Sequence, residues 1–166
     1  MKLRFGTGGI PLTTKKRTTE EGIKRMRALG LEHLELEFVY SVYVKEAEAP
    51  KVKAVAAQED ISISVHGSYY TNFASPEAAK WHASISRLVQ AAERGEQCGA
   101  RSITFHSGFF TGQDPETVHT RVVEGLGEAI LKLEEKQSTS IMIAPELTGK
   151  ASQYGSIEEL IRINKD

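Results

Sequence analysis

Two histidines and one glutamate occupy evenly spaced positions, and each directly follows a short run rich in apolar residues. His66, His106 and Glu146 are 40 positions apart, and the runs before them are residues 61–65, 102–105 and 141–145. Imidazole nitrogens and carboxylate oxygens are ligands of Zn²⁺ and Mn²⁺ in proteins. If the three runs are neighbouring parallel strands, their carboxyl ends meet at one rim. The pattern therefore predicts a divalent-metal site built from His66, His106 and Glu146.

Each of these residues also has a simpler interpretation. A single histidine at a strand end is more often structural than a metal ligand, so the prediction depends on all three residues together. A buried carboxylate needs a cation, and for Glu146 that cation could be Lys150 instead of a metal. Glu35 and Glu37 share a face of residues 33–38 with His33. Glu37 could enter the site, although a solvated or ion-paired face is the more common arrangement for such residues.

The runs belong to a repeating order of strands and helices. Apolar alternation and capping residues predict five strand–helix units. The expected strands are residues 3–7, 33–38, 61–65, 102–105 and 141–145, and the expected helices are 18–29, 44–58, 75–99, 114–133 and 156–163. Alternating strands and helices predict an α/β fold with a parallel sheet.

The number of strand–helix units leaves two possible architectures. A closed (β/α)₈ barrel has eight units in about 250 residues, whereas this chain has 166 residues. We therefore expect residues 1–166 to form a single domain, either an open five-stranded sheet or a partial (β/α) barrel of the TIM type. A partial barrel leaves the first and last strands unpaired along one edge, which favours homo-oligomers.

The composition argues against a membrane-spanning protein and against a disulfide-rich one. Hydrophobic residues make up 40% of the chain, and no apolar run approaches the roughly 18 residues of a membrane span. The lone Cys98 makes a disulfide framework impossible, so the cytoplasm is the expected location and a packed helix position the expected role of this residue. His82 and His119 fall within predicted helices and are expected at the surface.

The net charge and the charge distribution give different indications about nucleic-acid binding. The net charge of −1 does not favour nucleic-acid binding. Residues 1–27, however, contain eight Lys and Arg side chains against two acids. This basic segment is either a contact for phosphates or a solvated helix face, and the second is the more common case.

Three segments together resemble the endonuclease IV family, and most of all its small archaeal-type members, within the xylose-isomerase-like TIM-barrel superfamily. They are residues 64–72, 104–108 and 144–150. The resemblance implies zinc-dependent hydrolysis of the phosphodiester 5′ to an abasic site in DNA. It implies that His66, His106 and Glu146 hold one metal, with Glu146 shared with a second as the catalytic carboxylate. Tyr69 and Asn72 match positions that line the DNA-facing loop.

The chain departs from the family's pattern in its missing later strands, which carry the remaining metal ligands. We therefore expect an abasic-site endonuclease site with one complete metal position, holding Zn²⁺ or alternatively Mn²⁺, that does not cleave DNA through this chain alone. A metal-dependent sugar isomerase or epimerase, with Glu146 as ligand or base, is the alternative within the superfamily. A non-catalytic remnant that dimerises through its open sheet edges is the other alternative.

Overall fold

Five parallel strands form the central sheet of the computed structural model, which describes residues 3–166. Their order across the sheet is β1-β2-β3-β4-β6. The strands are β1 (Gly6–Gly8), β2 (His33–Glu37), β3 (Ser62–His66), β4 (Ala100–Phe105) and β6 (Met142–Pro145). Because β1 and β6 are outer strands of this sheet, it does not close, as expected for the predicted partial barrel.

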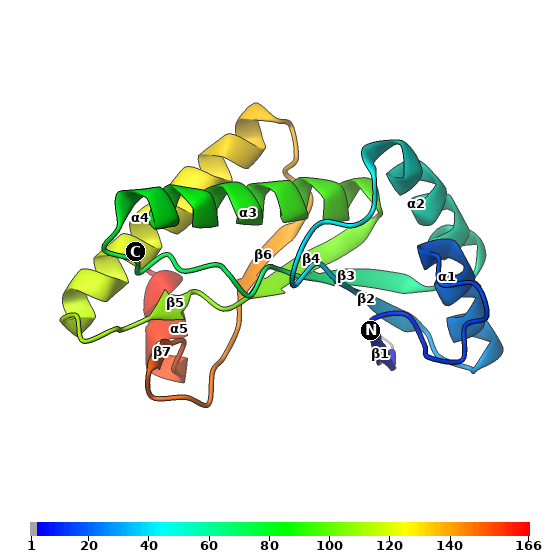
Figure 1. Cartoon of the computed structure of the whole chain (residues 1–166), viewed down its shortest axis with the longest axis horizontal. Helices are drawn as coiled ribbons and strands as arrows, with labels where there is room; N and C mark the ends of the chain where they lie inside the picture. Colours follow the sequence, from blue (N-terminus) through cyan, green and yellow to red (C-terminus); the bar gives the residue numbers. More distant parts are fainter. Residues whose placement is uncertain (1–2) are drawn as a thin grey trace.

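Helices connect the strands (Figure 1). They are α1 (Thr19–Ala28), the 3-10 turn η1 (Glu46–Glu48), α2 (Ala49–Gln58), α3 (Ala78–Gln97), α4 (Pro115–Glu135) and α5 (Ile157–Ile163). Helix α3 runs along the middle of the sheet, with α1 and α2 near the β1–β2 end and α4 and α5 near the β6 end. None of the helices in residues 3–166 is both long and apolar enough to cross a membrane.

Side-chain caps explain where three helices begin. Thr18, Asp114 and Ser156 each accept a hydrogen bond from the backbone amide three residues ahead. Such bonds satisfy amides that have no partner inside the first helical turn. These three helix starts were predicted from the sequence, and the structure confirms them.

The two faces of the sheet have different chemistry. Six apolar side chains from β2, β3 and β4 alternate along their strands and are buried in the core; they are Leu34, Leu36, Ile63, Val65, Ile103 and Phe105. The residues between them are polar and half-buried; they are His33, Glu35, Glu37, Ser62, Ser64, His66, Ser102 and Thr104. Because successive side chains point to opposite faces of a strand, the polar set shares the face away from the core.

Several predicted boundaries differ from the structure. The first strand is Gly6–Gly8 instead of residues 3–7, and the predicted helix 44–58 consists of η1 followed by α2. Pro50 explains the second difference, since proline lies at the start of α2, the one place where a helix tolerates its missing amide hydrogen. Local propensity does not resolve such ends because hydrogen bonds to distant residues determine them.

Candidate metal centre

The three predicted ligands meet at the carboxyl ends of neighbouring strands. His66 is the last residue of β3, while His106 directly follows β4 and Glu146 directly follows β6. The strand register places Phe105 opposite Pro145, so the residues that follow them leave the sheet side by side. One ligand atom from each of His66, His106 and Glu146 lies within 4.8 Å of the others. The structure thus brings together the three residues that sequence spacing singled out.

His66 has one ring nitrogen engaged and one available. Its Nδ1 lies 2.9 Å from the carbonyl oxygen of Gly67, so Nδ1 carries the proton and donates it there. The Nε2 lone pair then faces Glu146, whose Oε2 is 3.4 Å away. Gly67 lets this turn pack closely against β4, since a Cβ there would lie 3.0 Å from the Cβ of Phe105. A histidine whose tautomer is set by a backbone carbonyl is the usual form of a metal ligand.

Two atoms of the cluster are buried without a hydrogen-bond partner. They are Nδ1 of His106 and Oε2 of Glu146, which lie 3.5 Å apart. An unpartnered buried polar atom costs about 1–3 kcal/mol. Within residues 3–166 there is no ion pair between Glu146 and Lys150, so this alternative partner for the carboxylate is not formed. Two nitrogens and one oxygen with free lone pairs fit a Zn²⁺- or Mn²⁺-type ion.

Aromatic rings border the site on one side. Tyr69 makes an edge contact with His66 at 5.4 Å between ring centroids and lies nearly parallel to His106 at 6.5 Å. Its side chain is about half exposed, and Tyr40 packs against it edge-on. Tyr69 is therefore positioned to contact both the histidines and a molecule that approaches them.

Asn72 has a structural role in the loop after β3. Its Oδ1 accepts hydrogen bonds from the backbone amides of Ala74 and Phe109, which joins the loops that follow β3 and β4. Contact between Asn72 and a substrate stays a prediction.

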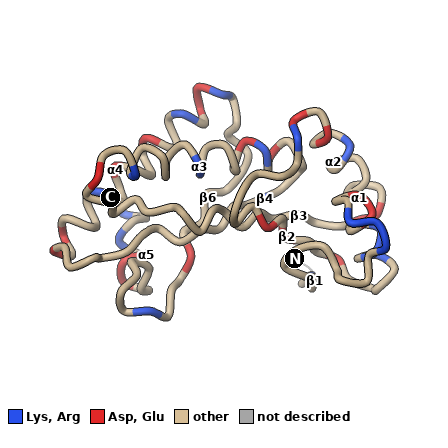
Figure 2. Tube along the Cα trace, in the orientation of Figure 1, with Lys and Arg blue, Asp and Glu red and all other residues tan. Residues whose placement is uncertain are grey.

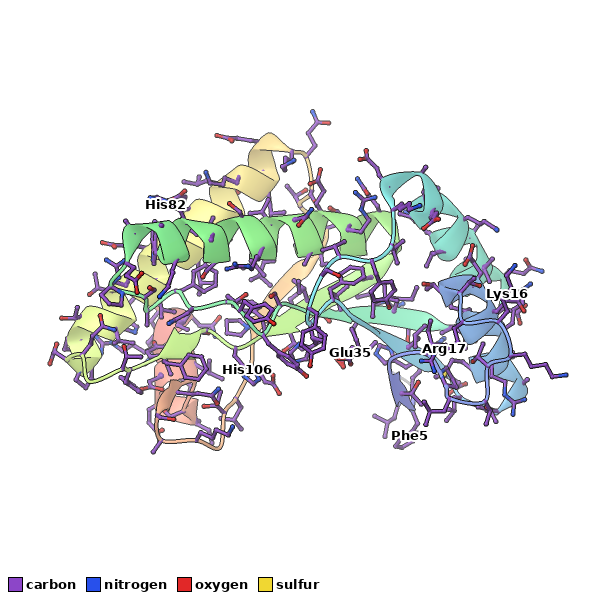
Figure 3. All side chains as sticks on the ribbon, in the orientation of Figure 1. Phe5, Lys16, Arg17, Glu35, His82 and His106 are labelled. Carbon is purple, nitrogen blue, oxygen red and sulfur yellow. The ribbon has the colours of Figure 1, made fainter. Side chains whose placement is uncertain are left out.

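Two further carboxylates face the same side of the sheet. Glu35 and Glu37 lie on β2 and are half-buried, and neither forms an ion pair in the described part of the chain. Burial, together with the neighbouring Glu37 carboxylate, raises the pKa of Glu35. Figure 3 shows Glu35 and His106 on the side of the sheet opposite α3, whereas His82 lies on α3. The sheet face around the candidate metal centre is therefore acidic.

The prediction for His119 was wrong, whereas His82 is exposed as predicted. His119 is only 4% exposed, and its two ring nitrogens contact Tyr154 and Asp166. Helical periodicity did indicate a buried face on this helix, with Val118 and Val122 among its residues, and His119 lies next to it. The partners come from residues 35 and 47 positions away, so no local pattern points to them.

The chain belongs to the xylose isomerase-like TIM-barrel family, whose model matches residues 23–166. An uncharacterized protein from Methanocaldococcus jannaschii is 34% identical over 161 residues, which is 97% of this chain and 57% of that protein. A probable endonuclease 4 from Petrotoga mobilis is 34% identical over 103 residues, covering 61% of this chain and 35% of the relative. This chain therefore spans little more than half the length of the relative that it matches over nearly all of its residues.

Solved structures with the same fold include two kinds of enzyme. The crystal structure of endonuclease IV from Thermus thermophilus aligns with a TM-score of 0.76 at 22% identity, covering 99% of this chain and 60% of that one. D-psicose 3-epimerase from Clostridium cellulolyticum aligns with a TM-score of 0.73 at 17% identity, covering 95% and 58%. At these identities the likeness establishes the fold alone.

Proposed function

We propose that the protein binds one divalent transition-metal ion, Zn²⁺ or Mn²⁺, through Nε2 of His66, Nδ1 of His106 and a carboxylate oxygen of Glu146. The observation that carries this proposal is the convergence of three ligand atoms, two of which are buried without another partner. Three protein ligands leave a coordination position for a substrate, as in catalytic sites. When bound, such an ion supplies Lewis acidity toward a substrate oxygen.

We further propose that the substrate is DNA with an abasic site, and that hydrolysis of the adjacent phosphodiester is the activity of the complete site. Two observations support DNA over a neutral ligand. The probable endonuclease 4 from Petrotoga mobilis is 34% identical to this chain over 103 residues. The loop between β1 and α1 also has three consecutive exposed cations, Lys15, Lys16 and Arg17.

These cations are available to phosphates. No ion pair of Lys15, Lys16 or Arg17 occurs among residues 3–166, and the nearest acids, Glu20 and Glu21, already pair with lysines. Figure 2 shows this basic loop beside α1, and Figure 3 labels Lys16 and Arg17 within it. The loop follows the carboxyl end of β1, as the metal ligands follow the ends of their strands, and barrel proteins bind substrates at that end of the strands. Unpaired cations supply the salt-dependent part of DNA affinity.

The test has two stages. Elemental analysis of the purified protein and of His66→Ala, each after zinc loading and dialysis, measures metal content. We expect about one zinc per chain. His66→Ala should lose this zinc, whereas the exposed control His82→Ala should retain it. Binding and cleavage of an oligonucleotide duplex with one abasic site are then compared with an intact duplex, with Zn²⁺ or Mn²⁺ added.

The outcomes distinguish metal binding from substrate choice. Zinc binding together with preferential binding of the abasic duplex supports both parts of the proposal. Zinc binding without any preference for abasic DNA overturns the substrate, and absence of zinc from the loaded protein overturns the site.

A sugar epimerase or isomerase is the second candidate. The observation in its favour is the half-buried carboxylate pair Glu35 and Glu37 on the face that carries the histidines, since a polyanion is repelled by carboxylates whereas a neutral sugar can hydrogen-bond to them. Turnover of ketohexoses with Zn²⁺ or Mn²⁺, in the same preparations that fail to bind DNA, would establish this candidate.

Oligomerisation is a separate proposal. Strands β1 and β6 each have one neighbour in the five-stranded sheet, and the sheet edge at β6 has the exposed Met142. Unpaired edges favour association between copies, so we propose that the chain forms homo-oligomers through them. Light scattering that gives the mass of one chain would overturn this proposal.

A further inference from the structure

We propose that Tyr154 is a positioning residue for the candidate metal centre. The inference rests on the metal site proposed above. Among residues 3–166, the hydrogen bonds and ring contacts of the Tyr154 side chain are with His119, Glu159 and Phe110 and not with a predicted ligand. Tyr154 belongs to a small two-stranded antiparallel sheet, β5 (Gly108–Phe109) and β7 (Gln153–Tyr154), separate from the central sheet. This small sheet joins the loops that follow two of the three predicted ligands.

The small sheet is directly connected to both ligands by the backbone. Gly108, two residues after His106, pairs with Tyr154. The next residue, Gly155, passes so close to Glu146 that a Cβ at this position would lie 2.7 Å from the Glu146 carbonyl oxygen. The amide of Thr148 donates to the Gly155 carbonyl at 2.9 Å, which closes the loop between Glu146 and β7. Moving Tyr154 therefore moves the backbone beside both His106 and Glu146.

Tyr154 is held in place by helix α4. Its hydroxyl oxygen lies 2.5 Å from Nδ1 of His119, and Nε2 of His119 lies 2.7 Å from the Asp166 carboxylate. The carboxylate can only accept, so Nε2 carries a proton, and in the neutral ring Nδ1 then accepts from the Tyr154 hydroxyl. The alternative acceptor, the Glu159 carbonyl, is 3.4 Å away. Tyr154 is 1% exposed, so water does not compete for this bond.

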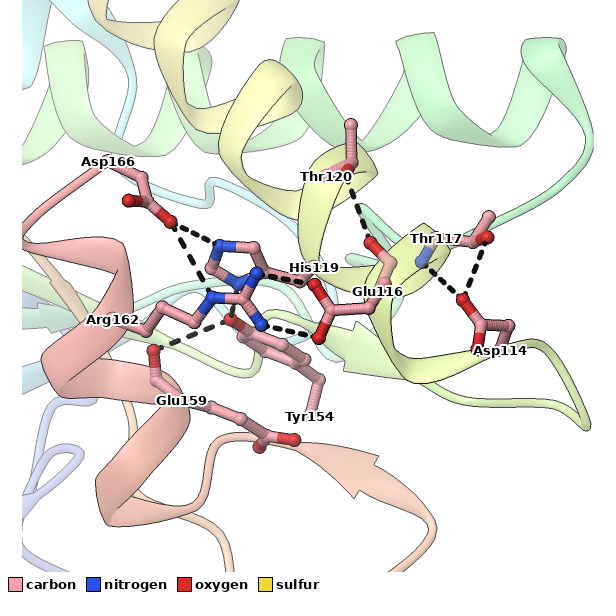
Figure 4. A network of polar contacts seen from close by, with 9 residues as sticks. All are labelled: Asp114, Glu116, Thr117, His119, Thr120, Tyr154, Glu159, Arg162 and Asp166. Carbon is pink, nitrogen blue, oxygen red and sulfur yellow. Dashed lines mark hydrogen bonds and ion pairs between the residues drawn. The ribbon is translucent and has the colours of Figure 1, made fainter.

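A second set of contacts braces the same region (Figure 4). Arg162 of α5 donates from its two terminal nitrogens to the Glu116 carboxylate of α4, and its Nε lies 3.7 Å from Asp166. Glu159 accepts from the amides of Gly155 and Ser156 at 2.8 Å each. The contacts thus run from α4 through His119 to Tyr154, and the next residue, Gly155, lies beside the backbone of Glu146. A rigid support of this kind sets ligand geometry. Loss of a partner bonded directly to a ligand typically weakens metal affinity 10- to 100-fold, so loss of this more distant support is expected at the lower end of that range.

The decisive variants separate the hydroxyl from the aromatic ring. Tyr154→Phe keeps the ring and removes the bond to His119, while His119→Leu removes the acceptor and His119→Asn retains an acceptor near the Nδ1 position. Zinc affinity is measured by competition with a chromophoric chelator, and Co²⁺ absorption spectra report coordination geometry. Thermal unfolding of the metal-free proteins verifies folding. The control Ile85→Val removes one buried methylene from α3, a helix that belongs to neither loop.

We expect Tyr154→Phe and His119→Leu to bind zinc about 10-fold more weakly, with an altered Co²⁺ spectrum, and His119→Asn to recover most of the affinity. Ile85→Val is expected to melt at a lower temperature and to bind zinc like the natural sequence. Equal affinity and identical Co²⁺ spectra in Tyr154→Phe and the natural sequence would overturn the positioning role alone. Failure of the natural sequence to bind zinc would overturn the positioning role together with the metal site.

Discussion

The cluster around His119 and the cluster of His66, His106 and Glu146 differ in how completely their polar atoms are hydrogen-bonded. In the cluster around His119, both ring nitrogens have partners within 2.7 Å. In the cluster of His66, His106 and Glu146, the closest approaches between side chains are 3.4 and 3.5 Å, and two atoms have no hydrogen-bond partner. A satisfied cluster stabilises the fold, whereas unsatisfied groups that converge are available for a ligand. The difference predicts opposite consequences for the same substitutions.

The largest effect is expected on metal affinity. His106→Ala removes one of three ligands, so zinc affinity should fall by more than the roughly 10- to 100-fold typical of an outer partner. His119→Ala leaves all three ligands in place and should weaken binding less. Chelator competition on both variants tests this order, and a larger loss in His119→Ala would contradict the contrast between the clusters.

Metal addition should stabilise the protein only through the open cluster. At a free zinc concentration of about 100 times Kd, the free energy of unfolding should rise by about 2.7 kcal/mol. The same concentration should leave the His106→Ala variant unchanged. Urea unfolding with and without zinc measures the difference, with Mg²⁺ as the control ion because it prefers an all-oxygen site. Equal stabilisation of the variant would place the zinc elsewhere.

Without metal, the order of effects on stability should reverse. His119→Ala removes the close partner of the buried Tyr154 hydroxyl and should lower the free energy of unfolding by about 1–3 kcal/mol. His106→Ala removes an atom that has no partner and should change it by less than about 1 kcal/mol. Urea unfolding of the two metal-free variants compares them directly. A greater loss in His106→Ala would show that His106 has a structural partner.

The smallest effect is expected at alkaline pH. Burial, followed by the Glu159 carboxylate, raises the pKa of Tyr154 from 10.0 to about 12. The unfolded chain therefore releases this proton at lower pH than the folded chain, so stability is lost as pH rises from about 10 to about 12. Unfolding at about pH 9 and about pH 11 should show a smaller decline in Tyr154→Phe than in the natural sequence. Cys98, whose pKa burial raises to about 11, contributes equally in both proteins.

The sequence alone determined the parts of this protein that depend on local pattern and strand order. Runs of alternating apolar residues located the strands, and the caps at Thr18, Asp114 and Ser156 located helix starts, because both depend on residues only a few positions apart. Equal spacing of His66, His106 and Glu146 then predicted their convergence, since parallel strands bring successive carboxyl ends to one rim.

Only the tertiary structure decided which polar atoms have partners. The bond from Tyr154 to His119 joins residues 35 positions apart, and that from His119 to Asp166 joins residues 47 apart. The pairing of Gly108 with Tyr154 likewise joins two-residue strands too short to leave a periodic signal. Such contacts depend on how α4, α5 and the two loops pack in three dimensions. For that reason His119 was misplaced at the surface, while the metal ligands were located from spacing alone.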